Sequence, residues 1–275
     1  MSEGRIRPIL KWPGGKFRLL DFILPELPEG KRLVEPFAGS GAVFMNTRYR
    51  SYLLADLNHD LIRFFETLAA RGEDFIDECR RLFSPEANQA EVFYERRERF
   101  NSLPSGAKER AALFLYFNRH GYNGLIRYNA KGGFNVPFGR YAKPRFPDKE
   151  MRAFLERSRT AKIEFRIGDF RDTFRSVRKG DVVYCDPPYI PLSATANFTS
   201  YAGNSFGATE QAGLAEAAEN ALAKGARVVM SNHDSEYARS LYRGASYMKD
   251  AEVRRFISCN GKKRDMVREL LAVYA

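Results

Sequence analysis

Residues 186–189 read Asp186-Pro187-Pro188-Tyr189 and directly follow the apolar run 181–185, so they lie where a buried strand is expected to end. A carboxylate and the carbonyl of Pro187 can accept both hydrogens of an exocyclic amine, which favours the form in which its nitrogen lone pair is free. The ring of Tyr189 can stack on a planar base, a contact worth about 1–3 kcal/mol. Many α/β proteins also end a strand in a proline-stiffened loop, so the motif alone leaves a catalytic and a structural interpretation open.

A second motif, 32–44, has the pattern of a strand, a glycine turn and the start of a helix. Gly39 and Gly41 would let a ligand approach the backbone closely. The next short apolar strand ends in Asp56, which is placed to accept hydrogen bonds from ribose hydroxyls. Phe44 stands where a dinucleotide-binding turn needs a third small residue. The pattern therefore favours a nucleoside cofactor without phosphates, and S-adenosylmethionine, with S-adenosylhomocysteine as its product, is the leading candidate.

The segment 10–16 holds the single tryptophan, Trp12, beside two lysines and a pair of glycines. One interpretation is a structural entry into the helix expected at 17–24, with Trp12 packed on the core. The other places Trp12 and Lys16 over the methionine end of the cofactor, where a lysine would meet the carboxylate. Spacing alone leaves both interpretations open.

Length and composition define the class of protein that carries these motifs. The 275 residues alternate helical and strand patterns, and 44% of them are hydrophobic, which is typical of an ordered α/β protein. A formal charge of +11 favours a polyanionic partner, nucleic acid above all. Cys79, Cys185 and Cys259 are far apart and lack metal-type spacing, so we expect a reduced cytoplasmic protein without a metal site. No apolar run reaches the roughly 20 residues that span a bilayer, so no membrane partner is expected, and the expected state is a monomer.

Between Asp56 and a strand expected at 162–167, the composition changes. Apolar residues at helical spacing predict helices at 60–70, 73–83, 89–102 and 107–119. From Arg110 to Pro147 there is no aspartate or glutamate, while aromatic, asparagine and glycine residues are interleaved with cations. These cations are Arg110, Arg119, Arg127, Lys131, Arg140, Lys143 and Arg145. We expect this basic segment to form a loop or hairpin that contacts phosphates and stacks on bases.

The last third of the chain supplies further strands and helices. Asp169 and Phe170 follow the strand at 162–167 and could hold an adenine by its amine and its ring, although Asp169 as the N-cap of a short helix is equally open. A helix is expected at 210–224 and a buried strand at 226–230. Strands at 253–258 and 267–273 are expected to form a hairpin around 260–264, whose basic tip either touches DNA or only aids solubility.

Several of these segments, taken in order, resemble the Dam-type DNA N6-adenine methyltransferases. The matching segments are 11–16, 35–41, 122–129, 134–141, 186–189, 191–199 and 231–234, so the resemblance covers nearly the whole chain. It implies a site-specific enzyme that transfers a methyl group from S-adenosylmethionine to N6 of an adenine flipped out of double-stranded DNA, within GATC. Neither a metal nor a covalent intermediate is required.

The expected fold is a Rossmann-like doubly wound α/β sheet with a C-terminal antiparallel hairpin and an inserted helical DNA-recognition domain. The expected catalytic domain comprises 1–58 and 147–275, and the target-recognition domain comprises 59–146.

The resemblance also implies roles for single residues. Tyr122 would wedge into the duplex where the adenine leaves, and Asn123 would meet the orphaned thymine. The expected base readers are Lys11, Leu125, Arg127 and Pro137, and the other expected DNA contacts are Arg140, Tyr141 and Ser193. The expected cofactor contacts are Trp12, Lys16, Phe37, Gly39, Gly41, Asp56, Asp169, Phe170 and Asp186. Ala142 stands where relatives commonly have a lysine, so one phosphate contact would be missing.

Other residues that could do chemistry are given structural roles. Cys185 is expected in the core, because methylation of an exocyclic amine needs no cysteine nucleophile. His59, His120 and His233 share no spacing that suggests a metal site or a triad, so structural or solvent roles are expected.

Other functions remain open from the residues alone. A methyltransferase acting on cytosine N4 or on a protein glutamine would keep the cofactor site, but more often carries Ser or Asn before Pro-Pro-Tyr. A non-catalytic DNA-binding regulator would need neither Asp186 nor Tyr189. A nicotinamide-dependent dehydrogenase would need a better pyrophosphate loop.

Overall fold

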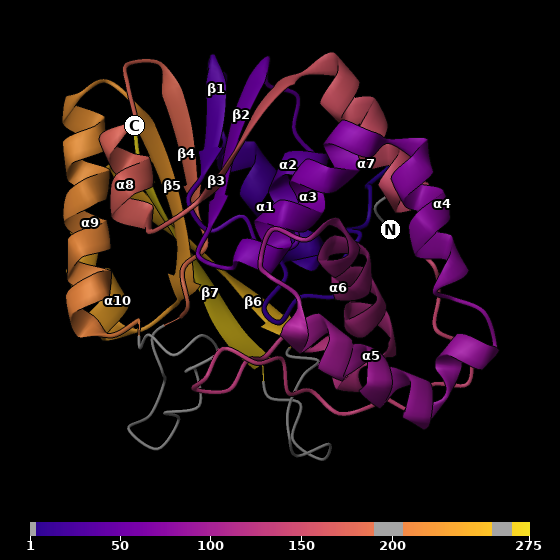
Figure 1. Cartoon of the computed structure of the whole chain (residues 1–275). Coiled ribbons are helices and arrows are strands. Elements are labelled where there is room, and N and C mark those ends of the chain that lie inside the picture. Colours follow the sequence, from indigo (N-terminus) through magenta and orange to yellow (C-terminus); the bar gives the residue numbers. More distant parts are fainter. Residues whose placement is uncertain (1–3, 190–205, 255–265) are drawn as a thin grey trace.

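The computed structural model describes residues 4–189, 206–254 and 266–275, and these contain a seven-stranded sheet in the order β3-β2-β1-β4-β5-β7-β6 (Figure 1). The strands are β1 (Arg32–Glu35), β2 (Ser51–Asp56), β3 (Lys162–Ile167), β4 (Asp181–Cys185), β5 (Arg227–His233), β6 (Tyr247–Arg254) and β7 (Met266–Tyr274). β1 to β5 pair in parallel, and β7 is antiparallel to both β5 and β6. The doubly wound sheet and its C-terminal hairpin are thus confirmed.

The burial of the strands follows their position in the sheet. β1 and β4 lie at its centre and are buried at every position, as parallel strands covered on both faces should be. Among the described strands, β3 pairs with β2 alone, and it is partly exposed along its length. The five parallel strands end at one edge of the sheet, which we call the carboxyl edge, and begin at the opposite one, the amino edge. Ligands of open α/β sheets bind at the carboxyl edge.

Helices cover both faces of the sheet (Figure 1). One face packs against α8 (Phe170–Arg175), α9 (Ala208–Ala223) and α10 (Glu236–Leu241). The other face packs against α1 (Leu20–Ile23), α2 (Ala42–Met45), α3 (His59–Arg71) and α7 (Asp148–Thr160). Short 3-10 turns at Lys16–Leu19 and Leu24–Glu26 flank α1. The two apolar clusters are separated by the sheet itself.

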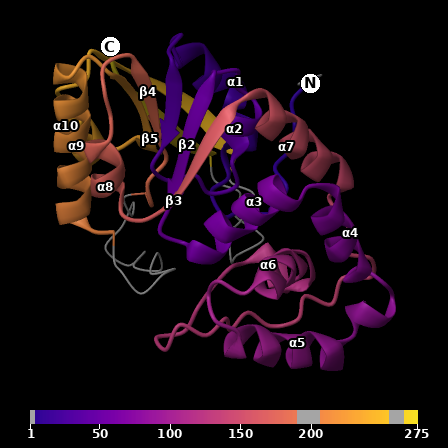
Figure 2. The ribbon, with the colours of Figure 1, turned by 45° about the horizontal axis from the view of Figure 1, so that its top comes forward.

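A second layer of helices lies beyond α3 (Figure 2). It contains α4 (Glu73–Arg81), a 3-10 turn at Glu86–Asn88, α5 (Ala90–Ser102) and α6 (Lys108–His120). α6 is buried at every position from Arg110 to His120, because α3, α4 and α5 all pack around it. Since α3 contacts both β2 and α6, a single apolar core runs from the sheet into this layer. The proposed domain boundaries at 58 and 146 stay a prediction.

The elements differ most from the expected ones at α7, which the sequence analysis did not expect, and at the C-terminus. β6 begins at Tyr247, not at Val253, because it pairs with β7 from Tyr247 opposite Val273 onward. The charges of Lys249, Asp250 and Glu252 conceal the strand pattern in the sequence, as is common in strands at a sheet edge. The expected hairpin turn at 260–264 and Cys259 lie outside the described residues.

Candidate active site and DNA interface

Asp186 lies directly after β4, at the carboxyl edge. Its Oδ1 is 2.8 Å from Nζ of Lys16 and accepts a hydrogen bond of 3.0 Å from Oγ of Ser231, at the end of the neighbouring β5. Burial raises the pKa of Asp186, whereas Lys16 and Ser231 act in the opposite direction. The two partners therefore favour the ionised carboxylate, which is the form that accepts hydrogen bonds without donating any.

Lys16 is almost fully enclosed in this site. Its ammonium group donates to the carbonyl of Gly14 at 2.6 Å and lies 4.4 Å from the ring centroid of Tyr189. Lys16 was expected to bind the carboxylate of the cofactor; in the structure the carboxylate it contacts is that of Asp186. The expected cofactor contact stays a prediction.

The remaining residues of the motif are held by α9 and β5. The Pro188 carbonyl accepts a hydrogen bond of 2.7 Å from Nε2 of the buried Gln211, whose Oε1 in turn accepts from Asn232 and Tyr242. Nothing in the described parts of the chain donates to the carbonyl of Pro187. That carbonyl and Asp186 are thus the two acceptors that the motif offers to an amine.

The Tyr189 ring packs edge-on against the ring of His233, with 4.6 Å between centroids. His233, which was given a structural or solvent role, therefore lies in the site. The resemblance of residues 231–234 to the Dam-type enzymes could have drawn attention to His233. Its contact with Tyr189 could not be predicted from the sequence.

The glycine turn follows β1 and is held by Asp56, which ends β2. Oδ2 of Asp56 accepts from the backbone N–H of Gly39 at 3.0 Å, and Oδ1 accepts from that of Asn58 at 2.9 Å. Gly39 has a φ of +48°, and a Cβ there would lie 3.2 Å from the indole of Trp12. The turn therefore needs glycine both for its conformation and for its contact with Trp12. Trp12 also packs on the apolar core, as the structural interpretation expects, and its expected cofactor contact stays a prediction.

Three phenylalanines form an aromatic wall between the glycine turn and α8. Phe37 stacks on Phe170 with 5.7 Å between centroids, and Phe206 packs against them at 5.6 and 5.7 Å. Asp169 caps α8 by accepting from the N–H of Arg171 at 2.8 Å, which confirms its expected N-cap role. Its contact with an adenine stays a prediction. Phe206 belongs to no motif, so sequence reasoning missed it.

Glu35, the last residue of β1, is a second residue that the sequence did not single out. It is 2% exposed, and its Oε1 has no hydrogen-bond partner among the described residues. Burial, with a contribution from the charge of Asp186, raises the pKa of Glu35 to about 8. A buried carboxyl oxygen without a partner costs about 1–3 kcal/mol, so it points to a ligand that carries a donor.

The basic segment forms an irregular hairpin. Antiparallel bridges join Gly121 to Phe138 and Tyr128 to Phe134, and the backbone N–H of Tyr122 donates to the Pro137 carbonyl at 2.9 Å. Tyr122 is 52% exposed at the base of this hairpin, in a 3-10 turn at Tyr122–Gly124. The expected loop or hairpin is thus present.

Lys11 connects this hairpin to the segment 10–16. Its ammonium group lies 4.4 Å from the ring centroid of Tyr141, whose hydroxyl accepts from the backbone N–H of Asn123 at 2.9 Å. A Cβ on Gly124 would lie 2.5 Å from the Lys11 side chain, so only glycine lets the two segments come so close. The fold therefore brings three of the expected DNA contacts together.

The other expected DNA contacts lie along the same hairpin. Arg127 is exposed, and its Nε donates to Oδ1 of Asn135 at 2.8 Å, which fixes its guanidinium. Leu125 is half-buried, whereas Pro137 and Arg140 are exposed. Ser193 lies outside the described residues, so its expected DNA contact stays a prediction.

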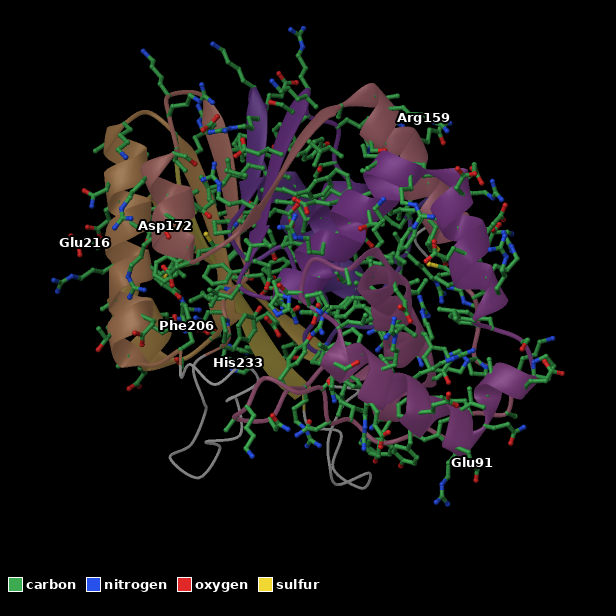
Figure 3. All side chains as sticks on the ribbon, in the orientation of Figure 1. Glu91, Arg159, Asp172, Phe206, Glu216 and His233 are labelled. Carbon is green, nitrogen blue, oxygen red and sulfur yellow. The ribbon has the colours of Figure 1, made fainter. Side chains whose placement is uncertain are left out.

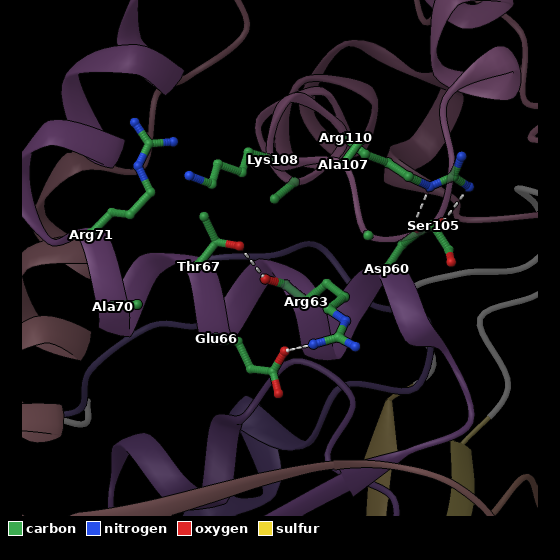
Figure 4. Close-up of a pocket in the computed structure, with 12 residues that line it drawn as sticks. Asp60, Arg63, Glu66, Thr67, Ala70, Arg71, Ser105, Ala107, Lys108 and Arg110 are labelled. Carbon is green, nitrogen blue, oxygen red and sulfur yellow. Dashed lines mark hydrogen bonds and ion pairs between the residues drawn. The ribbon is translucent and has the colours of Figure 1, made fainter.

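Two of the cations expected to supply positive charge for phosphates are buried instead. Arg110 forms two hydrogen bonds to Asp60, of 2.6 and 3.0 Å (Figure 4). Arg119 donates to the Ile9 carbonyl. Both lie on α6, which is a core helix, so their charge does not reach the surface. Arg145 pairs with Glu150 at 2.5 Å.

A cavity of about 380 Å³ lies beside the Asp60–Arg110 pair, between α3 and the start of α6 (Figure 4). Apart from Arg110, none of the residues expected to bind cofactor or DNA lines it. Hydrogen bonds from His59, Arg110 and Tyr128 outweigh the effect of burial and lower the pKa of Asp60 to about 2. This cluster ties α3, α6 and the hairpin together and contributes stability.

The described residues contain neither a metal-type cluster nor a membrane-spanning helix. No three histidine, cysteine, aspartate or glutamate side chains there are grouped as a metal site requires. Within the same residues, no helix combines the length and the apolar character that crossing a membrane demands.

Comparisons with known proteins agree with this geometry. The family model of the D12 class N6 adenine-specific DNA methyltransferases matches residues 12–256. The chain is 51% identical to a DNA adenine methylase of Salmonella typhi over 98% of its own length and 95% of that protein. It is 50% identical to a DNA adenine methylase of Escherichia coli K12, with the same coverage, and 49% identical to one of Vibrio cholerae over 98% and 96%.

Among solved structures, the delta-N METTL16 MTase domain matches 70% of this chain and 96% of that chain, at 14% identity and a TM-score of 0.24. The fold is assigned from the sheet order, not from this match. The family match and the relatives together exclude the four other functions considered for this sequence. These are a cytosine-N4 methyltransferase, a protein-glutamine methyltransferase, a non-catalytic DNA-binding regulator and a nicotinamide-dependent dehydrogenase. The chain belongs to the D12 class of N6 adenine-specific DNA methyltransferases, and it is a site-specific enzyme that methylates adenine in DNA.

Proposed function

We propose that the enzyme uses S-adenosylmethionine to methylate an adenine that has rotated out of duplex DNA, within the sequence GATC. The observation that carries the proposal is that the segment 11–16 contacts three parts of the proposed site. Lys11 lies on Tyr141 beside the hairpin, Trp12 lies on the glycine turn, and Lys16 lies on Asp186. One short segment thus joins the proposed DNA, cofactor and catalytic positions.

The residues around the glycine turn fit S-adenosylmethionine. Asp56 would bind the ribose hydroxyls, and the wall of Phe37 and Phe170 would flank the adenine. The unpartnered oxygen of Glu35 would accept from the ammonium group of the methionine part, which gives this buried carboxyl the donor that it lacks. When bound, the cofactor supplies an electrophilic methyl group on a sulfonium that is a good leaving group.

The Asp-Pro-Pro-Tyr motif would prepare the target amine. Asp186 and the Pro187 carbonyl accept its two hydrogens, which localises the nitrogen lone pair. Lys16 and Ser231 hold the Asp186 carboxylate in place and favour its ionised form, so that this acceptor needs no rearrangement. Positioning of this kind can contribute about 7–11 kcal/mol to the lowering of a barrier.

Rotation of the adenine out of the duplex costs a few kcal/mol, which new stacking contacts must offset. Tyr122, exposed at the base of the hairpin, would enter the gap in the duplex. Tyr189 would stack on the extruded base, and Lys16 and His233 fix its ring from two directions. Each such contact is worth about 1–3 kcal/mol.

The decisive experiment is methyl transfer to a defined duplex. Purified enzyme is incubated with labelled S-adenosylmethionine and duplexes that carry GATC or the same bases in scrambled order. We expect label on adenine N6 of the GATC duplex only, and about a hundredfold less with Asp186→Ala. Asp172→Ala, which removes an exposed aspartate on α8, is the control and should keep full activity. Equal labelling by the parent and Asp186→Ala would refute the role of Asp186, and equal labelling of both duplexes would refute GATC.

A second experiment assigns the hairpin residues. Arg127→Ala should lower the discrimination against one wrong outer base by about 1–3 kcal/mol, because an arginine can bind guanine through two hydrogen bonds. Arg140→Ala should weaken binding to all duplexes alike, as the loss of a phosphate contact does. The reverse pattern would exchange the two roles.

A further inference from the structure

We propose that the amino edge of the sheet is a second DNA-binding surface, which holds a duplex segment separate from the one at the catalytic site. The surface is formed by Lys31, Arg50, Arg159, Lys162, Lys179 and Arg227, which we call the amino-edge cluster. All of these side chains are exposed, and each lies at the start of a parallel strand or just before it. Figure 3 shows Arg159 at the end of the molecule opposite His233 and Phe206.

The sheet order arranges these cations in a row. β3, β2, β1, β4 and β5 are neighbours in that order, so Lys162, Arg50, Lys31, Lys179 and Arg227 follow one another across the edge. Backbone hydrogen bonds tie the entering loops together: Lys162 N–H to Arg50 O at 3.1 Å, and Lys31 N–H to Gly180 O at 3.1 Å. Five strands span roughly 20 Å, over which duplex DNA carries about a dozen negative charges.

The cluster carries almost no compensating charge. In the entering loops 27–31, 46–50, 157–162, 176–180 and 223–227, the one acidic residue is Glu29. None of the six cations forms an ion pair with any residue that the structure describes, whereas some exposed arginines elsewhere, Arg99 and Arg152 among them, are paired. A merely solvated surface normally mixes both signs of charge, so a row of one sign indicates a polyanionic partner.

Duplex DNA is the polyanion that the rest of the molecule favours. Lys131, Arg140 and Lys143, in the proposed DNA hairpin, are likewise exposed and without ion pairs within the described chain, so the two surfaces share the property that suits phosphate contact. β4 separates the amino edge from Asp186 by its whole length, about 15 Å or more. The two surfaces can therefore hold two duplex segments at once, and the enzyme can pass between distant segments without leaving the DNA.

The test measures bridging between two duplexes and needs no methyl transfer. One duplex without GATC is fixed to beads, and a second, labelled duplex of the same sequence is free in solution at low salt. We expect the parent enzyme to capture the labelled duplex. The triple variant Arg50→Gln/Lys179→Gln/Arg227→Gln should bind the second duplex about tenfold more weakly, or weaker still. A plot of the log of its binding constant against the log of the salt concentration should become less steep by about 2.7.

The matched control removes the same charge elsewhere. Arg81, Lys108 and Lys149 are exposed and have no ion pair in the described structure, so Arg81→Gln/Lys108→Gln/Lys149→Gln should capture the duplex as the parent does. Thermal unfolding verifies that both triple variants are folded. The proposal fails if the parent captures no second duplex, or if both variants capture it equally. It also fails if polyglutamate binds through the cluster while DNA does not, since the partner would then be an acidic protein.

This outcome is independent of GATC recognition and of the cofactor. Bridging with duplexes that lack the target would persist even if the proposed target sequence were wrong. Conversely, labelling of GATC by an enzyme that cannot bridge would leave the proposed reaction intact.

Discussion

The two ends of the same five parallel strands differ in how their charged side chains are buried and paired. At the carboxyl edge, charged side chains are enclosed and have fixed partners: Asp186 has Lys16 and Ser231, and Asp56 holds two backbone N–H groups. At the amino edge, cations such as Lys31 and Lys179 are exposed and have no ion-pair partner in the described structure. A charge with fixed partners can orient a reacting atom, whereas one without partners acts at a distance on a polyanion.

One ion pair shows that burial, and not the edge itself, decides this difference. Arg32 begins β1 at the amino edge, yet it donates to Asp181 at 3.2 and 2.6 Å and to the Ser176 carbonyl at 3.0 Å. Both partners are less than 10% exposed. Neighbouring charges at the amino edge are therefore expected to respond differently to substitution, according to their burial.

The largest effect is expected from breaking this buried pair. Asp181→Ala leaves the Arg32 guanidinium buried without a carboxylate, which should lower the free energy of unfolding by about 3–5 kcal/mol. Arg50→Gln, at the same edge but exposed, should change it by less than about 0.5 kcal/mol. Denaturant unfolding of both variants measures the difference. Similar losses in the two variants would mean that burial does not separate these charges.

Lys16→Met should have the next largest effect, on activity. It leaves the partly buried Asp186 without its cation, so the pKa of Asp186, already raised by burial, should rise further. The carboxylate works when ionised, so activity is lost as the pH falls through its pKa, and the acid limb of the pH profile should move to higher pH. At neutral pH we expect a loss of about a hundredfold, or about 2.7 kcal/mol.

The pH profile of kcat/KM distinguishes the two roles considered for Lys16. A raised KM for S-adenosylmethionine with an unmoved acid limb would show that the lysine serves the cofactor carboxylate instead. Lys108→Met is the control, because Lys108 is exposed and lacks an ion pair within the described residues. It should leave both quantities unchanged.

The sequence predicted the positions of these groups better than their contacts. Asp186, Asp56 and the glycine turn were placed correctly at the carboxyl edge, because short apolar strands and glycines are local features. The Lys16–Asp186 pair could not be predicted, since it joins residues far apart in the chain. The same holds for Arg110, whose charge was expected at the surface: only the packing of α6 shows that it is buried on Asp60.

The start of β6 was the strand boundary that the sequence predicted worst. β6 carries alternating charges at the sheet edge, so its pattern resembles a loop. The amino-edge cluster was also invisible, because its members are dispersed singly through the sequence and meet only in the order of the strands. By contrast, α3 to α6, four of the five α-helices described between Asp56 and β3, were expected within about two residues of their bounds, because helical periodicity is a local signal; α7 was not expected.

A smaller effect is expected from Ser231→Ala. It removes one hydrogen bond to the Asp186 carboxylate and should lower activity at neutral pH about tenfold, or about 1.4 kcal/mol, while the acid limb again moves to higher pH. Tyr184→Phe is the matched control: it removes the buried hydroxyl that lies 3.2 Å from Ser231 and keeps the bond to Asp186. Its acid limb should stay in place. A shift of equal size in both variants would indicate a general loosening of the site.

The smallest effect is expected from Lys179→Gln, at the centre of the amino edge. Lys179 has no ion pair to lose among the described residues and lies among other cations, so its removal relieves repulsion. The free energy of unfolding should change by less than about 0.5 kcal/mol, with a slight gain at low salt that disappears when salt screens the neighbouring charges. Denaturant unfolding at two salt concentrations measures it. A loss above about 1 kcal/mol would mean that Lys179 stabilises the fold through contacts of its own. The two edges would then not differ in whether their charged side chains have partners.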